Sequence, residues 1–521
     1  MLILVIVLLY FAVLLGIAFY TSRGANNETF FIGQKKSNWL LVAYGMIGTS
    51  LSGVTFMSVP GEVNAKGFIY MQVVIGYFIG YMVVAFVLLP LYYRLNLTSI
   101  YSYLQSRFGN TSYKTGASFF LLSRTLGASI RIYLVLIVLQ HFLLDALGVP
   151  FVVTVFVILL MILLYTFNGG VKTIVWTDTL QTTGMILALI ITIALINSSL
   201  GFSFGDLLGA VQAKGYTTIF QTQDWKAGSF FIKQILGGAF VTITMTGLDQ
   251  EMMQKNISVR NVGESQKNMM LFSVILVVVN LLFLILGGAL YIFLSSKGIA
   301  FPAKGDETFS TVALQYLPPV AGLVFILGLV SALFPSADGA LTALTSSFCI
   351  DVLGMKDRQD WSEEQKLKTR RIVHISVTVL FLVLILVYQR VIEASVISTI
   401  LKVAGYTYGP LLGLFAFGIL TKRKLTERLV PITCILAVLF CILLTMPFAD
   451  SFYTYIPHFK GVQFFQNCYA WGIGILAGYN NWRLAMLNGY QFGFELLVLN
   501  GLITFIGLFL ISKQDAKAAV I

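Results

Sequence analysis

Long apolar runs recur from one end of this 521-residue chain to the other. Each run holds about 20 residues, the length that an α-helix needs to cross the hydrocarbon core of a bilayer. Hydrophobic residues make up 58% of the sequence and charged residues only 11%, and no gap between the runs suits a separate soluble domain. We therefore expect an all-α polytopic membrane protein whose function lies within the membrane.

Thirteen apolar segments are long enough to be interpreted as transmembrane helices. They lie near residues 2–21, 38–60, 68–92, 116–145, 150–168, 174–197, 229–254, 269–294, 311–350, 372–390, 396–420, 428–447 and 489–512. The first segment lacks the basic start and the small-residue cleavage site of a signal peptide, so we keep it as a helix. We expect a single membrane domain over residues 1–521.

The formal net charge of +12 is explained by the loops between these helices. If the N-terminus is outside, most Lys and Arg residues fall on the cytoplasmic side, including the runs KDRQDWSEEQKLKTRR (356–371) and TKRKLTER (421–428). This topology predicts a plasma-membrane protein with a cytoplasmic C-terminus. In a bacterium, that membrane is the inner membrane. The expected partner is the lipid bilayer, and no nucleic acid is expected.

Motifs for membrane enzymes and ATP-driven pumps are absent from the sequence. It contains neither HExxH, which would bind zinc, nor the phosphate-binding loop GxxxxGK[ST]. We therefore expect no enzyme activity and no organic cofactor. Transport, sensing and scaffolding remain, and a sensor is disfavoured because no output domain is attached.

Two of the segments have the composition of interrupted helices. The second contains GTSLSGVTFMSVPG (48–61) and the seventh contains GGAFVTITMTGLDQ (237–250), both rich in Gly and small hydroxyl residues. Each alone could be a tightly packed helix interface. Interrupted helices at equivalent places in two halves of a chain, however, indicate a transporter with inverted repeats and a binding site at mid-membrane. We expect these repeats at 38–197 and 229–420.

Four charged residues lie deep within the predicted spans: Arg124, Arg131, Asp178 and Asp338. A charge at the centre of a bilayer costs roughly 2.5–3.5 kcal/mol even on the lenient insertion scale, so each needs a reason to be there. Neither aspartate has a lysine at helical spacing. The two carboxylates therefore suggest a cation that binds and leaves.

The stretch SALFPSADGALTALTSSFCID (331–351) carries polar groups into the ninth span. Ala332 and Ser336 lie one turn apart on one helix face, and Pro335 has no N–H, which frees the Ser331 carbonyl from its usual hydrogen bond. With the Asp338 carboxylate, this stretch offers several oxygens to a small cation. The alternative is a kinked helix whose Asp338 binds a neighbouring side chain.

Four motifs resemble the sodium/solute symporter family, which includes sodium/glucose, sodium/proline and bacterial sialic acid symporters. They are TSLSGVTFMSVPG (49–61), YTFNGGVKTIVWTDTLQ (165–181), DQEMMQK (249–255) and GPLLGLFAFGILTKR (409–423). The first looks most like the bacterial sialic acid branch. The resemblance implies a LeuT-type fold of ten core helices in two inverted repeats, with one extra helix before them (2–21) and two after (428–512).

The resemblance also implies a sodium site. Its ligands would be the carbonyls of Gly48, Leu51 and Ala332 and the hydroxyl of Ser336, with Na⁺ as the coupling ion. Another hydroxyl of the family pattern falls on Pro335, so Ser331 or Asp338 would have to supply the missing oxygen.

A second sodium site, found in some family members, resembles Asp178 facing two serines one turn further along the ninth span. These positions hold Asp338 and Gly339 here. A carboxylate there could strengthen cation binding or could hold a proton. Proton coupling on the same fold therefore stays open.

In relatives the solute pocket lies beside the broken helix. This predicts Ser50, Ser52 and Thr55 as solute-binding residues, with Tyr70 and Gln72 of the next span as further candidates. Sodium entering from outside would complete this pocket and favour the outward-open state.

In the sialic acid branch an arginine of the fourth span holds the solute's carboxylate. Gap-free matching places Gly127 there, with Arg124 and Arg131 about one turn to either side. Either arginine could bind a carboxylate, or could instead pair with Asp178 or Asp338. We expect import of an anionic sugar acid such as sialic acid or of another carboxylate, ahead of a neutral sugar and then an amino acid. The resemblance allows a monomer.

Overall fold

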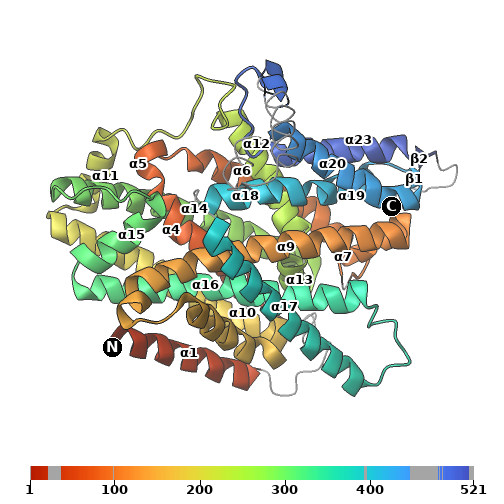
Figure 1. The fold of residues 1–521 in the computed structure, drawn as a ribbon, viewed down its shortest axis with the longest axis horizontal. Helices are drawn as coiled ribbons and strands as arrows, with labels where there is room; N and C mark the ends of the chain where they lie inside the picture. The colour runs from red at the N-terminus through yellow and green to blue at the C-terminus, as the bar shows by residue number, and fades with distance from the viewer. Residues whose placement is uncertain are drawn as a thin grey trace, which may run out of the picture.

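The computed structural model describes residues 2–21, 37–97, 99–391, 396–445, 479, 481–483 and 485–514. In these ranges helices dominate, and the one sheet is a two-residue antiparallel pairing of β1 (Lys424–Leu425) with β2 (Ser512–Lys513). Most long helices run side by side along one direction of the molecule (Figure 1). The prediction of an all-α polytopic membrane protein is confirmed.

The first half of the chain forms a bent span followed by long helices. Its elements are α1 (Leu2–Thr21), α3 (Trp39–Ser50), α4 (Gly53–Gly61), α5 (Val63–Lys66), α6 (Tyr70–Val83), the π-turn η2 (Val84–Leu88), α7 (Leu89–Arg94), α8 (Ser102–Phe108), α9 (Asn110–Leu139), η3 (Gln140–Leu144), η4 (Asp145–Leu147), α10 (Phe151–Leu200) and α11 (Phe204–Ala213).

The second half begins with another bent span. Its helices and turns are α12 (Phe231–Thr242), the π-turn η5 (Ile243–Gly247), α13 (Gln250–Ile257), α14 (Val262–Ser296), η6 (Gly305–Glu307), α15 (Thr308–Thr311), η7 (Val312–Tyr316), α16 (Pro319–Ser347), η8 (Phe348–Val352), α17 (Glu363–Val391), α18 (Val396–Thr407), α19 (Gly409–Leu420), η9 (Glu427–Leu429), α20 (Val430–Thr445) and α23 (Leu496–Leu510).

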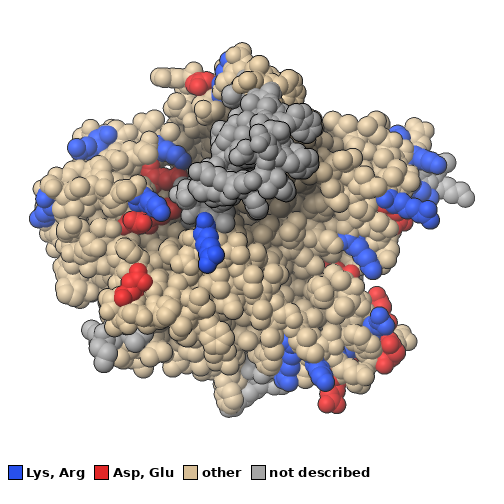
Figure 2. Space-filling view, in the orientation of Figure 1, with Lys and Arg blue, Asp and Glu red and all other residues tan. Residues whose placement is uncertain are grey.

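Length and composition make seven of the described helices able to cross a membrane, or ten if each of three bent pairs counts as one span. Three shorter apolar helices, Val5–Thr21, Phe151–Phe167 and Leu496–Leu510, fall below the length criterion. All thirteen predicted segments overlap one of these helices or bent pairs, and the number of crossings stays a prediction. On the face shown in Figure 2, charged side chains gather toward the two ends of the long helices.

Several predicted boundaries differ from the structure. The segments 150–168 and 174–197 fall within one helix assignment, α10. The ninth segment begins at Pro319 instead of 311, because Pro318 and Pro319 offer no N–H to extend a helix from the preceding turn. The last segment, predicted from 489, becomes helical as α23 only from Leu496.

Two sharp bends interrupt helices at the places that the Gly- and Thr-rich stretches predicted. The axes of α3 and α4 meet at 56°, and those of the α12–η5 helix and α13 meet at 65°. A third bend, of 43°, separates α18 from α19. Helix α16 lies at the centre of the bundle and packs on α9, α10 and α3. Of an apolar stretch within Pro319–Val352, 78% is buried inside the protein. The two bends and α16 set the position of the polar groups described next.

Candidate solute and cation site

The bend between α3 and α4 opens a gap in the helical backbone. Leu51 (φ −85°, ψ 82°) and Ser52 (φ −76°, ψ 174°) leave helical geometry, and α4 resumes at Gly53. The carbonyls around such a bend lack their intrahelical donors, so they can accept from a solute or a cation. The polar side chains that flank this bend line a cavity.

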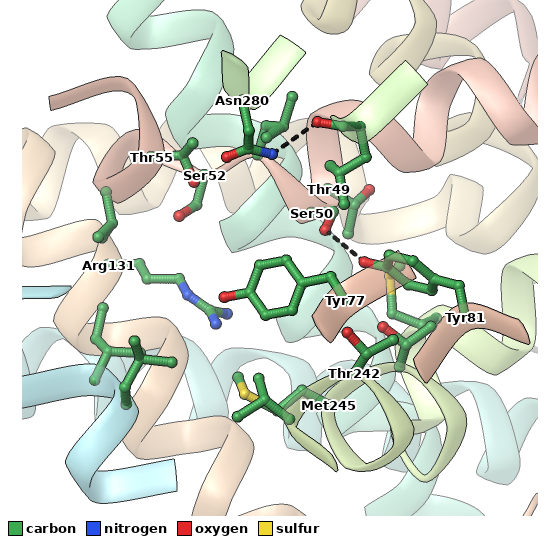
Figure 3. Close-up of a pocket in the computed structure, with 18 of the residues that line it drawn as sticks. Thr49, Ser50, Ser52, Thr55, Tyr77, Tyr81, Arg131, Thr242, Met245 and Asn280 are labelled. Carbon is green, nitrogen blue, oxygen red and sulfur yellow. Dashed lines mark hydrogen bonds between the residues drawn. The ribbon is translucent and has the colours of Figure 1, made fainter. Parts of the chain in front are cut away.

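This cavity has a volume of about 100 Å³ and lies between the bend, α6, α9, η5 and α14 (Figure 3). Its polar lining is made of hydroxyl, amide and guanidinium groups: Thr49, Ser50, Ser52, Thr55, Tyr70, Tyr77, Tyr81, Thr242, Thr246, Asn280, Arg124 and Arg131. Its apolar lining includes Val54, Val241, Met245, Met252, Leu276, Ile400 and Leu401. A wall of this kind suits a compact, hydroxylated solute.

Most of the predicted solute-binding residues lie together at this cavity. Ser50, Ser52, Thr55 and Tyr70 all line it, and the Ser50 hydroxyl lies 3.4 Å from the Tyr81 hydroxyl. Gln72 is not among the lining residues.

The Gln72 side chain instead ties α6 to the loop before α12. Its amide nitrogen donates to the carbonyls of Ile69 and Ser229, and its amide oxygen accepts from the Gln221 backbone. Gln72 lies two residues from Tyr70 on the helix, and such residues point in different directions. In the structure Gln72 therefore holds a loop.

Two tyrosines of α6, Tyr77 and Tyr81, were missed by the sequence reasoning. Tyr70, Tyr77 and Tyr81 are separated by seven and four residues, which puts them on one face of a helix. The Tyr70 and Tyr77 hydroxyls lie 3.2 Å apart. This spacing was a usable signal for a polar stripe facing the bend.

The two arginines of α9 have different surroundings. The Arg124 guanidinium pairs with the Glu251 carboxylate and lies 3.7 Å from Asp249 Oδ2. The Arg131 guanidinium points into the cavity toward Tyr77 (Figure 3). Within the described parts of the chain, Arg131 has no ion pair or hydrogen bond. Arg131 is therefore the cationic group left to a solute.

The partners of Arg124 differ from the expected ones, Asp178 and Asp338. They come from the second bend, where Asp249 caps α13 by accepting from the backbone N–H groups of Glu251 and Met252. The predicted seventh span ended at 254, which placed this acidic segment near the membrane surface. The 65° bend instead carries it into the core, where Asp249 and Glu251 are at most 2% exposed.

A larger hollow of about 760 Å³ adjoins the cavity and shares Tyr70 and Leu401 with it. Among the residues that the structure describes, its charged lining residues are Glu62, Lys66, Lys402 and Arg483. Lys66 pairs with Glu62 at 3.0 Å, and the formal charges of these four described residues sum to a positive value. The hollow is therefore suited to attract anions toward the cavity.

The predicted sodium ligands lie where α3 approaches α16. A Cβ atom on Gly48 would lie in ordinary van der Waals contact with Pro335 Cγ, at 3.5 Å, but only 2.5 Å from Thr182 Oγ1, so glycine is needed for the approach of α3 to α10. The Gly48 N–H donates to Thr182 Oγ1 of α10 at 3.0 Å. Leu51 and Ala332 are 1% and 0% exposed. The predicted ligands thus belong to two helices in contact.

The Ser336 hydroxyl is a buried polar group without a hydrogen-bond partner in the described structure. An unsatisfied buried hydroxyl costs roughly 1–3 kcal/mol, and a ligand bound to Ser336 would offset that cost. A sodium ion accepts oxygens of this type. The residues present therefore fit the predicted cation.

The two candidates for the missing oxygen already have protein partners. The Ser331 hydroxyl lies 2.9 Å from the Tyr10 hydroxyl of α1. Asp338 Oδ2 accepts from the Tyr165 hydroxyl at 2.6 Å, and its Oδ1 accepts from the Gly339 N–H. A carboxylate oxygen can accept more than one contact, so Asp338 keeps the capacity to bind a cation.

Asp178 meets a lysine that the sequence reasoning did not place beside it. Lys255 Nζ lies 2.7 Å from Asp178 Oδ2, although helical spacing offered Asp178 no lysine. Lys255 belongs to α13 and Asp178 to α10, and only the second bend brings them together. The expectation that Asp178 lacks a fixed cationic partner is therefore corrected.

Two interrupted helices, a hydroxyl-lined cavity at one bend and a cation-type oxygen cluster beside it define a secondary transporter that couples a solute to an ion. The family model "Sodium:solute symporter family" matches residues 30–428, and the chain belongs to this family. Sodium is its coupling ion.

Two relatives and one solved structure make the similarity concrete. The sodium/sialic acid symporter SiaT of Proteus mirabilis is 25% identical over 79% of this chain and 83% of its own length. The sodium/sialic acid symporter NanT of Aliivibrio fischeri is 24% identical over 78% and 80% of the two chains. The structure of a Na⁺-coupled sialic acid symporter, substrate-bound and outward-open, superposes with a TM-score of 0.79 over 99% of both chains at 19% identity. The LeuT-type fold is thereby confirmed.

Proposed function

We propose that this symporter uses the sodium gradient to import a small organic acid of the sialic acid class, with Arg131 binding the acid's carboxylate. The observation that carries this proposal is the Arg131 guanidinium, which points into the cavity without a partner among the described residues (Figure 3). Guanidinium binds carboxylate through two parallel hydrogen bonds, so a solute with a carboxylate satisfies it best.

The remaining lining supports a hydroxylated acid. Ser52, Thr55 and Asn280 face Arg131 across the cavity, and Thr242 and Tyr81 lie on a further wall (Figure 3). These groups both donate and accept hydrogen bonds, as sugar hydroxyls do. The positive hollow next to the cavity favours the approach of an anion over that of a neutral sugar.

The sodium site in this proposal consists of the Gly48, Leu51 and Ala332 carbonyls, the Ser336 hydroxyl and the Asp338 carboxylate. An ion there would bridge the bend after α3 to α16 and stabilise the bend, whose next residues line the solute cavity. Binding of one ligand then raises the affinity for the other, because both require the same arrangement of the bend. Rocking of the repeats at 38–197 and 229–420 would expose the site to the cytoplasm.

The membrane context belongs to the same proposal. We place the protein as a single domain, acting as a monomer, in a bacterial inner membrane with the N-terminus outside and the C-terminus cytoplasmic. The basic runs at 356–371 and 421–428 then lie on the cytoplasmic side, as the positive-inside rule requires.

The test is uptake into proteoliposomes with an inward sodium gradient, against choline at equal ionic strength. Sialic acid, a second sugar acid, glucose and an amino acid serve as solutes. Wild-type protein should take up an acid only with sodium, and Arg131→Gln should weaken its binding by roughly 10- to 150-fold, the equivalent of about 1.5–3 kcal/mol for a charged hydrogen bond.

Two variants sharpen this test. Arg107→Gln removes an arginine that bonds the Gly418 and Thr421 carbonyls away from the cavity, and it should retain solute affinity. Gly127→Arg in the Arg131→Gln background returns an arginine one turn away, at a position with open space for a side chain, and should restore part of the uptake. Unchanged uptake by Arg131→Gln would contradict the carboxylate role.

A further inference from the structure

Lys255 is a buried lysine that joins three helices beside the proposed sodium site. It is 3% exposed, and its ammonium lies 2.7 Å from Asp178 Oδ2 on α10 and 2.6 Å from Thr49 Oγ1 on α3. Thr49 Oγ1 also donates to Asp178 Oδ2 at 3.1 Å. The three polar groups form a closed triangle at the end of α3, immediately before the bend.

This triangle resembles the coordination of a small monovalent cation. An ammonium carries one positive charge and three donors, and here it contacts a carboxylate and a hydroxyl oxygen. A sodium ion would demand the same oxygens. The position that a sodium ion would take next to Asp178 is therefore already occupied by the ammonium group of Lys255, a residue of α13.

The neighbouring residues keep Lys255 in this position. Glu251 Oε1, one helical turn before Lys255, lies 3.6 Å from its ammonium, and Glu251 Oε2 pairs with Arg124. A Cβ atom on Gly339 of α16 would overlap the Glu251 carboxylate, so only glycine at 339 leaves room for this side chain. The packing of α13 against α16 thus orients the lysine toward Asp178.

Asp338 is left in a different situation from Asp178. It interacts electrostatically with both Asp178 and Lys255, but no salt bridge joins it to a lysine or arginine in the described ranges. Its protein partners are the neutral Tyr165 hydroxyl and a backbone N–H. In the described structure, the Asp178 carboxylate is therefore paired with the Lys255 ammonium, whereas the Asp338 carboxylate has no cationic side chain in a salt bridge with it.

We propose that the Lys255 ammonium is a built-in cation at Asp178, so that the protein binds one exchangeable sodium ion, at Ser336 and Asp338, and no second ion at Asp178. This inference rests on the proposed function, since it assumes a mobile sodium ion. Because the lysine cannot leave with the solute, it contributes nothing to coupling. One sodium ion and one carboxylate would then cross together without net charge.

The experiment counts sodium ions bound to the purified protein in detergent, by equilibrium dialysis with ²²Na⁺ in the absence of solute. Wild type should saturate at one ion per chain, and Asp178→Asn should still bind one. Lys255→Ala should bind two, because a second sodium ion replaces the lost ammonium at Asp178. Lys233→Ala removes another buried lysine, which bonds the Lys226 and Gln491 carbonyls, and should leave the count at one.

Two results would overturn the inference. Two ions in wild type with one in Asp178→Asn would show that Asp178 binds an exchangeable ion despite Lys255. A count that stays at one in Lys255→Ala would show that sodium cannot take the ammonium's place. If Lys255→Ala fails to fold, the double variant Lys255→Met with Asp178→Asn removes both charges and should still bind one ion. A count of zero in this variant would show that the sodium site at Ser336 and Asp338 depends on Asp178 and Lys255, which contradicts the inference. No ion bound to wild type would instead reject the proposed function itself.

Discussion

The two bent spans have similar compositions and opposite surroundings. At the bend of α3 and α4, uncharged hydroxyl groups such as Ser50, Ser52 and Thr55 face a cavity. At the bend of α12 and α13, Asp249, Glu251 and Lys255 are buried and paired. The comparison teaches that an interrupted helix can be stabilised by a ligand or by side chains of the protein, and that the first kind leaves polar groups available to a solute.

The paired bend should be the more sensitive one to loss of a charge. Arg124→Gln leaves Asp249 buried without its cation and Glu251 with Lys255 alone, and breaking a buried ion pair costs about 3–5 kcal/mol. Thermal unfolding in detergent should show a large fall in the midpoint. Arg131→Gln is the matched control. Arg131 lies two turns further along the same face of α9, and its replacement should change the midpoint little. Equal destabilisation by the two variants would contradict the division into a paired and an open arginine.

The open bend should be the more sensitive one to added volume. Gly48→Ala would place a Cβ 2.5 Å from Thr182 Oγ1 and would force α3 away from α10. Overpacking of this kind costs about 1–3 kcal/mol, and sodium binding should weaken with it. Gly16→Ala on α1, where a Cβ would meet no atom within 4 Å, is the control for helix glycines. Unfolding midpoints with and without sodium measure both effects, and an unaffected Gly48→Ala protein would reject the close approach.

Loss of one cation ligand should lower sodium affinity without harming the empty protein. Ser336→Ala removes a hydroxyl that has no protein partner in the described structure, so stability in choline should not fall. The sodium-dependent rise in the unfolding midpoint should require about tenfold more sodium, the equivalent of about 1.4 kcal/mol. Ser346→Ala removes another buried, unpartnered hydroxyl of α16 and should keep the wild-type sodium response. Identical responses in the two variants would exclude Ser336 as a ligand.

The smallest effect is expected at the wall of the solute cavity. Tyr81→Phe removes the 3.4 Å contact with the Ser50 hydroxyl, and a long neutral hydrogen bond contributes no more than about 1 kcal/mol. Solute affinity in the uptake assay should fall less than tenfold, and the sodium response should persist. A complete loss of uptake would place Tyr81 among the essential groups of the cavity.

Much of the fold could be predicted because it depends on local composition. Apolar runs of membrane-spanning length predicted the helices. Clusters of Gly, Pro and small hydroxyl residues predicted the bends after α3 and before α13, since Gly and Pro interrupt helices. Ser50, Ser52 and Thr55 were assigned to the solute cavity through the resemblance to the symporter family. Helix ends were less accurate, as α23 and α16 show, because hydropathy does not mark where hydrogen bonding starts.

The pairings of charged residues could not be predicted in this way. Helical spacing relates a residue to neighbours on its own helix, and Lys255 reaches Asp178 from another helix beyond a bend. The same reasoning left Arg124 and Arg131 equivalent, although the structure commits one of them to Asp249 and Glu251.

The sequence by itself therefore determined that this is a helical membrane transporter with broken helices, because burial in lipid requires satisfied backbones and makes every exception conspicuous. Only the tertiary structure decided which charges meet. Ion pairs depend on distances of a few ångströms between separate helices, and those distances arise from bend angles and from glycines such as Gly48 and Gly339 that allow close approach.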